Sequence, residues 1–198
     1  MKTIFRNKKI SGLLSVLPAT TIKFEDEINN YTFPPKQTLR LQKVMGYKQH
    51  AIVKETTATS DLCLAGLEYI LQKGWLKKEE IGGIVVACSY PDHFIPPVSL
   101  ILQGKLQLSE DVYCVDISQG CVGFLIALTQ GLMLLEYMKD KKVVVISADV
   151  LSKKVSKQDR NSFPLIGDAA GIAVVENCEE ESEIFTIIRN NGSMGDAL

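Results

Sequence analysis

The sequence contains little histidine, a single tryptophan and no uninterrupted apolar stretch long enough to cross a membrane. Its two histidines, His50 and His93, and the lack of a Cys-x-x-Cys pair argue against a zinc site. A net charge of −1 argues against a broad nucleic-acid surface. We therefore expect no metal, no nucleic-acid partner and no membrane association.

The remaining composition is that of a globular protein. Of 198 residues, 46% are hydrophobic and 23% are charged, which is enough for a packed core. Five cysteines are an odd number, and no clear cleavage site follows the short apolar run near the start. Together these features predict a reducing compartment, and hence a cytoplasmic protein.

One stretch, from Val112 to Met138, reads as a buried strand, a tight turn and a long apolar helix. Cys121 lies at the turn between Gly120 and Gly123, where glycine allows a sharp reversal and a close backbone approach. We expect the positive end of the helix to favour the thiolate, as in a nucleophile elbow. The alternative is that Cys121 is a small buried hydrophobe, as many free cysteines are.

The rest of the chain alternates strands and helices, which predicts an α/β fold around a mainly parallel sheet. The further expected strands lie near residues 10–17, 84–88, 143–147, after 168, and 185–189. The further expected helices lie near residues 24–29, 39–46, 60–74 and from 98 onward. No low-complexity segment or hard internal boundary interrupts this pattern.

Three segments carry a resemblance to a known family. DISQGCVGFLIAL, around Cys121, resembles the active-site segment of the β-ketoacyl-acyl carrier protein synthase III family, within the thiolase-like superfamily. The stretches 159–176 and 190–198 resemble the family's aspartate–arginine and GD-x-AG segment and its later glycine segment, in the family's order. The resemblance implies a layered αβαβα thiolase-like fold. Residues 1–178 would form its N-terminal half, and 179–198 would begin the second.

The resemblance also implies an acyltransferase. Cys121 would take an acyl group from acyl-coenzyme A for decarboxylative Claisen condensation with malonyl on acyl carrier protein, in fatty-acid or related biosynthesis. No cofactor is implied beyond these substrates. The family dimerises by joining sheets edge to edge, so we expect a homodimer, with the strand at 112–117 as the edge.

Four further site residues come from the resemblance. Arg160 matches the arginine at the adenine and phosphate end of coenzyme A, and Arg40 stands where the family has an adenine-stacking tryptophan. Ile95 stands at the usual phenylalanine of a loop that lines the acyl pocket, beside Phe94. The alternative for Arg160 is a surface salt bridge, for instance with Asp159.

Other polar residues receive structural interpretations. Asp168 is expected to accept backbone hydrogen bonds in a turn. His50 is interpreted as a surface residue, and His93 as a weak candidate for a general base.

No segment matches the histidine and asparagine that the family places in its second half. The chain could therefore be part of a longer protein, one subunit of a split enzyme, or a non-catalytic homologue. The alternative function is a non-catalytic or partner-dependent subunit that binds acyl carrier protein.

Overall fold

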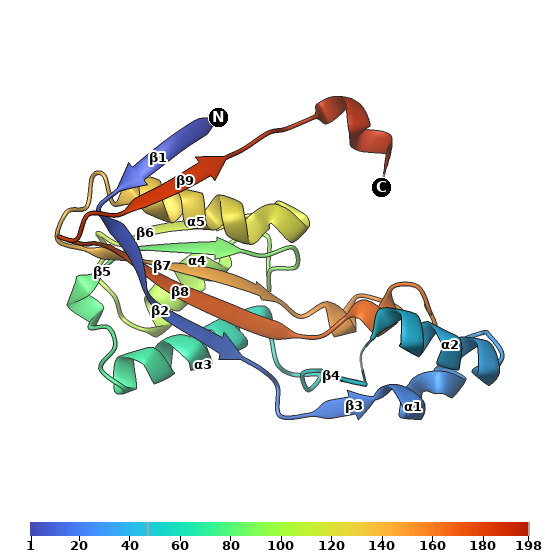
Figure 1. The fold of residues 1–198 in the computed structure, drawn as a ribbon. Helices are drawn as coiled ribbons and strands as arrows, with labels where there is room; N and C mark the ends of the chain where they lie inside the picture. The colour runs from blue at the N-terminus through green and yellow to red at the C-terminus, as the bar shows by residue number, and fades with distance from the viewer. Residues whose placement is uncertain (47, 198) are drawn as a thin grey trace.

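A five-stranded mixed sheet forms the centre of the computed structural model, which describes residues 1–46 and 48–197 (Figure 1). In spatial order its strands are β2 (Lys8–Val16), β8 (Ala169–Asn177), β7 (Lys142–Asp149), β5 (Ile81–Ala87) and β6 (Tyr113–Ile117). β5 pairs in parallel with β6 and β7, whereas β8 pairs antiparallel with β2 and β7. Four strands thus share one direction and β8 opposes them.

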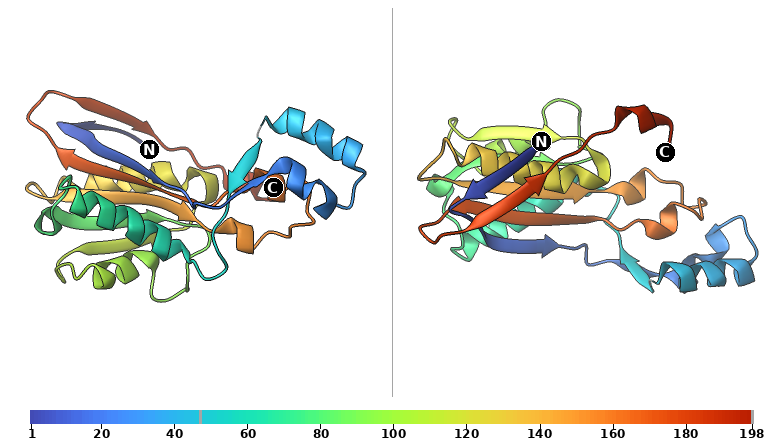
Figure 2. Two further views of the ribbon diagram at one scale, coloured as in Figure 1. Left: turned by 90° about the horizontal axis from the view of Figure 1, so that it is seen from below. Right: turned by 45° about the horizontal axis from the view of Figure 1, so that its top comes forward.

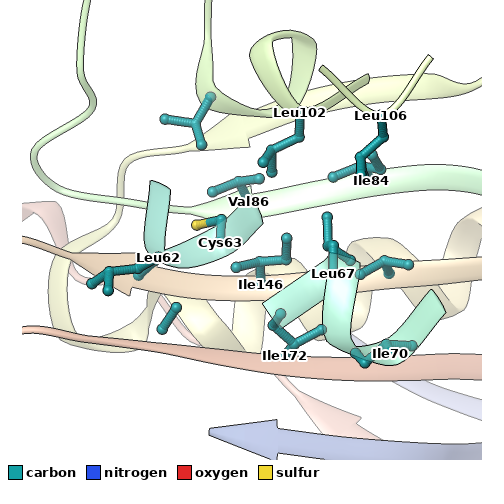
Figure 3. Close-up of a cluster of buried hydrophobic side chains, with 14 of the residues drawn as sticks. Leu62, Cys63, Leu67, Ile70, Ile84, Val86, Leu102, Leu106, Ile146 and Ile172 are labelled. Atoms are coloured by element: carbon teal, nitrogen blue, oxygen red, sulfur yellow. The ribbon is translucent and has the colours of Figure 1, made fainter. Parts of the chain in front are cut away.

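Helices cover both faces of this sheet. α3 (Thr59–Gln72) and α4 (Val98–Lys105) pack on one face, and α5 (Gly123–Leu134) packs on the other. Alternate side chains point to opposite faces: Ile84 and Val86 join the α3 and α4 cluster, while Val85 and Ala87 join the α5 cluster. Figure 3 shows residues of the first cluster, in which Leu67 of α3 and Leu102 of α4 gather with Ile84 and Ile146 of the strands. Burial on both faces explains why these strands read as continuous apolar runs.

Two small sheets extend the core. β1 (Lys2–Arg6) pairs antiparallel with β9 (Glu183–Ile187), so a strand near each end of the chain lies beside the other. β3 (Thr21–Lys23) pairs with β4 (Gln49–Ala51), and between them lie α1 (Phe24–Glu27) and α2 (Pro35–Met45). Residues 20–52, here called the helical lobe, lie beyond one end of the central strands (Figure 2). Short 3₁₀ turns occupy Ile28–Asn30, Lys78–Glu80, Gly120–Val122, Leu151–Lys153, Phe163–Leu165 and Gly192–Ala197.

The α/β fold class and the mixed sheet are confirmed, although the central sheet has two parallel and two antiparallel pairings and is not mainly parallel in its pairing. The sequence pattern did not reveal β1, and α2 begins at Pro35, four residues before the expected Leu39. α2 ends as expected at Gly46, whose φ of 76° is left-handed. In the part of the chain that the structure describes, no helix is long and apolar enough to cross a membrane. The expected boundary at residue 178 stays a prediction.

Candidate active site

Cys121 lies in an exposed 3₁₀ turn between β6 and α5. Gly120 adopts a φ of 55°, a left-handed conformation that side chains disfavour, and this residue reverses the chain. A Cβ atom on Gly123 would lie 3.3 Å from Cβ of Ala87, so α5 begins close against the end of β5. The expected strand, glycine turn and helix are therefore present, and the thiol is accessible.

The turn lies at the carboxyl edge of the parallel strands. β5, β6 and β7 run in one direction, so the segments that follow them leave from the same edge of the sheet. The backbone N–H of Cys88, after β5, donates to the carbonyl of Ile117, at the end of β6, at 3.1 Å. Carboxyl edges of this kind are common positions for binding sites in open α/β sheets.

Carboxylates fix the loop at 88–97, which follows β5. Oδ1 of Asp149 accepts hydrogen bonds from the backbone N–H groups of Ser89 and Tyr90, both at 2.8 Å. Farther along, Oδ1 of Asp92 accepts from the N–H of Ser60 at 3.0 Å, which joins the loop to the first turn of α3. Hydrogen bonds to charged acceptors are stronger than neutral ones, so this loop is firmly held.

The tip of the same loop exposes two large apolar side chains to solvent. Phe94 is 100% exposed and Ile95 is 87% exposed, which is unusual for large apolar side chains. Both residues follow β5 and thus lie on the same edge of the sheet as Cys121. Their expected role in lining an acyl site stays a prediction. His93 is also exposed.

The two predicted arginines lie in and against the helical lobe. Arg40 is an exposed residue of α2, and half-buried Arg160 lies in the segment that follows β7. The guanidinium carbon of Arg160 lies 3.5 Å from the ring centre of Phe33, just before α2. Asp159 does not pair with Arg160; Oδ1 of Asp159 accepts from the N–H of Asn161 at 2.9 Å, which lowers its pKa.

The interpretation of His50 as a surface residue is wrong. The side chain is buried, its Nε2 lies 3.1 Å from Oε2 of Glu27, and its Nδ1 contacts the carbonyl of Ile166. The ring also meets Phe163 edge to face at 5.6 Å between centres. β4 pairs with β3, and successive side chains of a strand point to opposite sides. Gln49 and Ala51 point outward, so His50 between them points into the lobe.

The structural interpretation of Asp168 is confirmed. Asp168 is 1% exposed, and its two oxygens accept from the N–H groups of Val53 at 2.9 Å and Ser152 at 3.0 Å. Its own N–H donates to the carbonyl of Ala51 at 2.9 Å. Asp168 thereby fastens the helical lobe to the segment after β7.

The other thiols are less suited to nucleophilic chemistry. Burial raises the pKa of Cys63 to about 12 and also raises the pKa of Cys88, with nearby carboxylates adding to both shifts. Burial and then Asp116 raise the pKa of Cys114. Among the described cysteines Cys121 alone is exposed.

An apolar groove runs along the outer side of α5. It has a volume of about 380 Å³ and lies between α5 and the segment at 184–190. Leu125, Phe185 and Ile187 line it and are 62%, 59% and 49% exposed. The helix therefore buries one face against the sheet and leaves a second apolar face uncovered.

Sequence reasoning missed Phe33, Asp116 and Asp149. The two aspartates had a usable signal, since each lies near the end of a strongly apolar strand and is followed by loop or turn residues. Phe33 had none, because its contact with Arg160 joins segments far apart in the sequence.

Comparison with known sequences places this site in context. The family profile for 3-oxoacyl-[acyl-carrier-protein (ACP)] synthase III matches residues 115–192. The β-ketoacyl-[acyl-carrier-protein] synthase III of Clostridium beijerinckii is 31% identical over 192 residues, covering 97% of this chain and 58% of that protein. The enzyme of the same name from Clostridium perfringens strain SM101 is 37% identical over 141 residues, covering 71% of this chain and 43% of that protein.

Solved structures share the fold. A 3-oxoacyl-(acyl-carrier protein) synthase from Burkholderia xenovorans superposes with a TM-score of 0.91 at 22% identity, covering 99% of this chain and 56% of that one. The 3-oxoacyl-[acyl-carrier-protein] synthase III of Aquifex aeolicus superposes with a TM-score of 0.77 at 29% identity, covering 87% and 55%. The likeness confirms the thiolase-like fold, and the chain spans a little over half the length of these proteins.

Proposed function

Because the chain belongs to the β-ketoacyl-acyl carrier protein synthase III family, we propose that it carries the nucleophile of an acyl-transferring condensing enzyme. The observation that carries this proposal is the exposed Cys121 in a glycine turn at the carboxyl edge of the parallel strands. A nucleophile must be reachable by its substrate and held by rigid elements, and this turn meets both requirements.

In the proposed first step, the thiolate of Cys121 attacks the carbonyl carbon of an acyl-coenzyme A thioester. A tetrahedral intermediate forms and collapses, the bond to the coenzyme A sulfur breaks, and the released thiolate takes up a proton. The N–H of Cys121 lies in the opening 3₁₀ turn, where amides lack partners within the helix, and supplies one donor to the oxyanion.

In the proposed second step, malonyl carried on acyl carrier protein loses carbon dioxide. The resulting carbanion attacks the acyl-cysteine thioester, a carbon–carbon bond forms and the thiol of Cys121 is released. The family's histidine and asparagine for this step match no segment of the chain. Acyl transfer to Cys121 is therefore the step that can be tested directly on this chain.

The test is the intact mass of the purified protein before and after incubation with acetyl-coenzyme A. We expect an increase equal to one acetyl group, located on Cys121 by peptide mapping and lost in Cys121→Ala. Cys178→Ala is the matched control, because it removes a partly exposed thiol remote from the turn in sequence. Acetylation that persists in Cys121→Ala would contradict the proposal.

A second candidate is a partner-dependent subunit that binds acyl carrier protein or a complementary half. The uncovered apolar face of α5, with Leu125 and Met133 exposed beside Val122 of the preceding turn, favours this alternative. It predicts no acylation by this chain alone and acylation after a partner is added. Homodimer formation through the free edge of β6 is likewise a proposal, supported by the place of β6 at the end of the strand order.

A further inference from the structure

Asn191 and Gly192 form an exposed asparagine–glycine pair in the segment after β9. Figure 1 shows the 3₁₀ turn Gly192–Ala197, in red, beyond the end of β9. A Cβ atom on Gly192 would meet nothing within 4 Å, so no side chain from elsewhere crowds the backbone at this residue. The N–H of Gly192 opens the turn and therefore has no acceptor within it. Its nitrogen can be reached by the side chain of Asn191.

Ser193 orients and polarises the carboxamide of Asn191. Oδ1 of Asn191 accepts hydrogen bonds from the N–H of Ser193 at 3.2 Å and from its Oγ at 2.7 Å. The bond to the N–H two residues on closes a small ring of atoms that contains both the carboxamide carbon of Asn191 and the nitrogen of Gly192. Two donors on one carbonyl oxygen also stabilise negative charge that develops on it. An electrophilic carbon is thus held beside a backbone nitrogen.

We propose that Asn191 is a site of spontaneous modification, at which the chain converts this asparagine through a cyclic succinimide. Hydroxide removes the proton from the backbone nitrogen of Gly192, and that nitrogen forms a bond to the carboxamide carbon of Asn191. The side-chain nitrogen takes up a proton and leaves as ammonia. Water then opens the ring at either carbonyl and gives aspartate or isoaspartate. The conversion consumes one water, releases one ammonia and needs no oxidant or enzyme.

The modification places a new charge beside the apolar groove of α5. Asn190, the residue before the site, lines that groove. Both products add one negative charge, and isoaspartate also adds a methylene group to the backbone of the segment. A charge at the edge of an apolar surface opposes the burial of that surface. The proposal does not depend on the proposed function, because the conversion involves neither Cys121 nor a thioester.

Peptide mapping of the purified protein incubated at pH 8 tests this, with a synthetic peptide of residues 187–198 incubated alongside. Trypsin cleaves after Arg189 and releases the segment. By the time the synthetic peptide is half converted, we expect at least as much conversion in the protein, because the turn orients the reacting groups. Fragment ions should place the change at Asn191, with Asn190 unchanged, since a bulkier asparagine follows Asn190. Isoaspartate is diagnostic, because direct hydrolysis of the side chain gives only aspartate. An unmodified Asn191, or aspartate without isoaspartate, would overturn the proposal.

Variants separate the contributions of the two neighbours. We expect Gly192→Ala to lose the isoaspartate product over the same time, because a Cβ atom screens the nitrogen, and to keep the fold, because that atom meets nothing. Ser193→Ala should slow the conversion severalfold, since it removes the Oγ donor and keeps the N–H. Ser162→Ala is the matched control, because Ser162 is also exposed and also lies close after an asparagine, Asn161. Faster conversion in Ser193→Ala would show that these hydrogen bonds protect Asn191, and would contradict the proposed role of the turn.

Discussion

The carboxylate of Asp116 accepts a hydrogen bond from the backbone N–H of Val98 at 2.7 Å, across the boundary between β6 and α4. Its other oxygen accepts from the N–H of Ser99 at 2.9 Å. The first turn of α4 therefore receives its cap from a strand, five residues before Cys121. The strand that leads to the candidate nucleophile also holds the end of the loop at 88–97.

Removing this cap should destabilise the protein. We expect Asp116→Ala to lower the free energy of unfolding by about 1–2 kcal/mol, because two amides at a helix start lose a charged acceptor. Asp116→Asn keeps one oxygen acceptor, so its free energy of unfolding should lie between those of the parent and Asp116→Ala. Urea denaturation measures the difference, and Asp111→Ala, an exposed carboxylate before β6, is the control. Equal stabilities for Asp116→Ala and the control would contradict the assignment.

Thiol labelling should distinguish the cysteines. With limiting iodoacetamide at pH 8 we expect Cys121 to be modified first, because it is exposed. Cys63 and Cys88 should react last, because burial raises the pKa of both thiols, and a pKa of about 12 leaves a thiolate fraction of about one in ten thousand at pH 8. Peptide mass mapping over time measures the order. Early labelling of Cys63 in the folded protein would show that the α3 cluster is open in solution.

Two helical glycines should respond in opposite directions to the same substitution. A Cβ atom on Gly131 of α5 would lie 2.8 Å from Cγ2 of Val145, so Gly131→Ala forces the helix away from the sheet. We expect a loss of about 1–3 kcal/mol in the free energy of unfolding.

The matched control for Gly131→Ala is Gly104→Ala in α4, where a Cβ atom would meet nothing within 4 Å. This change should stabilise the protein by about 0.5–1 kcal/mol, since alanine favours the helix. Thermal or urea denaturation of both variants and the parent measures the two changes in stability. A stabilised Gly131→Ala would contradict the close packing of α5 on β7.

The stability contributed by Glu80 should depend on pH. Its carboxylate accepts from the N–H of Lys77 at 2.7 Å and lies 3.1 Å from Nζ of Lys142, and these contacts lower its pKa, the backbone hydrogen bond first. A lowered folded-state pKa means that the contribution is present above the unfolded pKa of about 4.3 and is lost as pH falls through the folded value.

Glu80→Gln should therefore unfold at lower urea than the parent at pH 7, and the two midpoints should converge near pH 3. Glu79→Gln is the control, because the side chain of Glu79 is next to Glu80 in the sequence but is exposed and makes no such contact. A difference between Glu80→Gln and the parent that is constant from pH 7 to pH 3 would exclude the carboxylate as its source.

The uncovered face of α5 should govern self-association. We expect the isolated chain to form dimers or larger species, and Leu125→Lys to shift it toward monomer by charging the groove. Sedimentation velocity at several concentrations measures this. Gln130→Lys is the charge control. Glu136→Lys is unsuitable, because Glu136 forms an ion pair with Lys8 that the substitution would remove. A parent chain that sediments as a monomer would contradict the expectation.

The sequence by itself determined the fold class, the order of the five central strands and the helices between them, and the position of Cys121. Apolar runs at 81–87 and 142–149, the glycines around Cys121 and the family segments are local signals that need no knowledge of contacts. The same holds for Asp168, because an acid in a small-residue turn has few roles other than accepting backbone hydrogen bonds.

Only the tertiary structure decided what joins distant segments. His50 is buried because β4 pairs with β3, and Arg160 meets Phe33 because Asp168 fastens the segment after β7 to the helical lobe. Asp116 caps α4 because β6 ends beside the first turn of that helix. Such contacts depend on pairing across many residues, and periodicity, which describes one element at a time, carries no record of them.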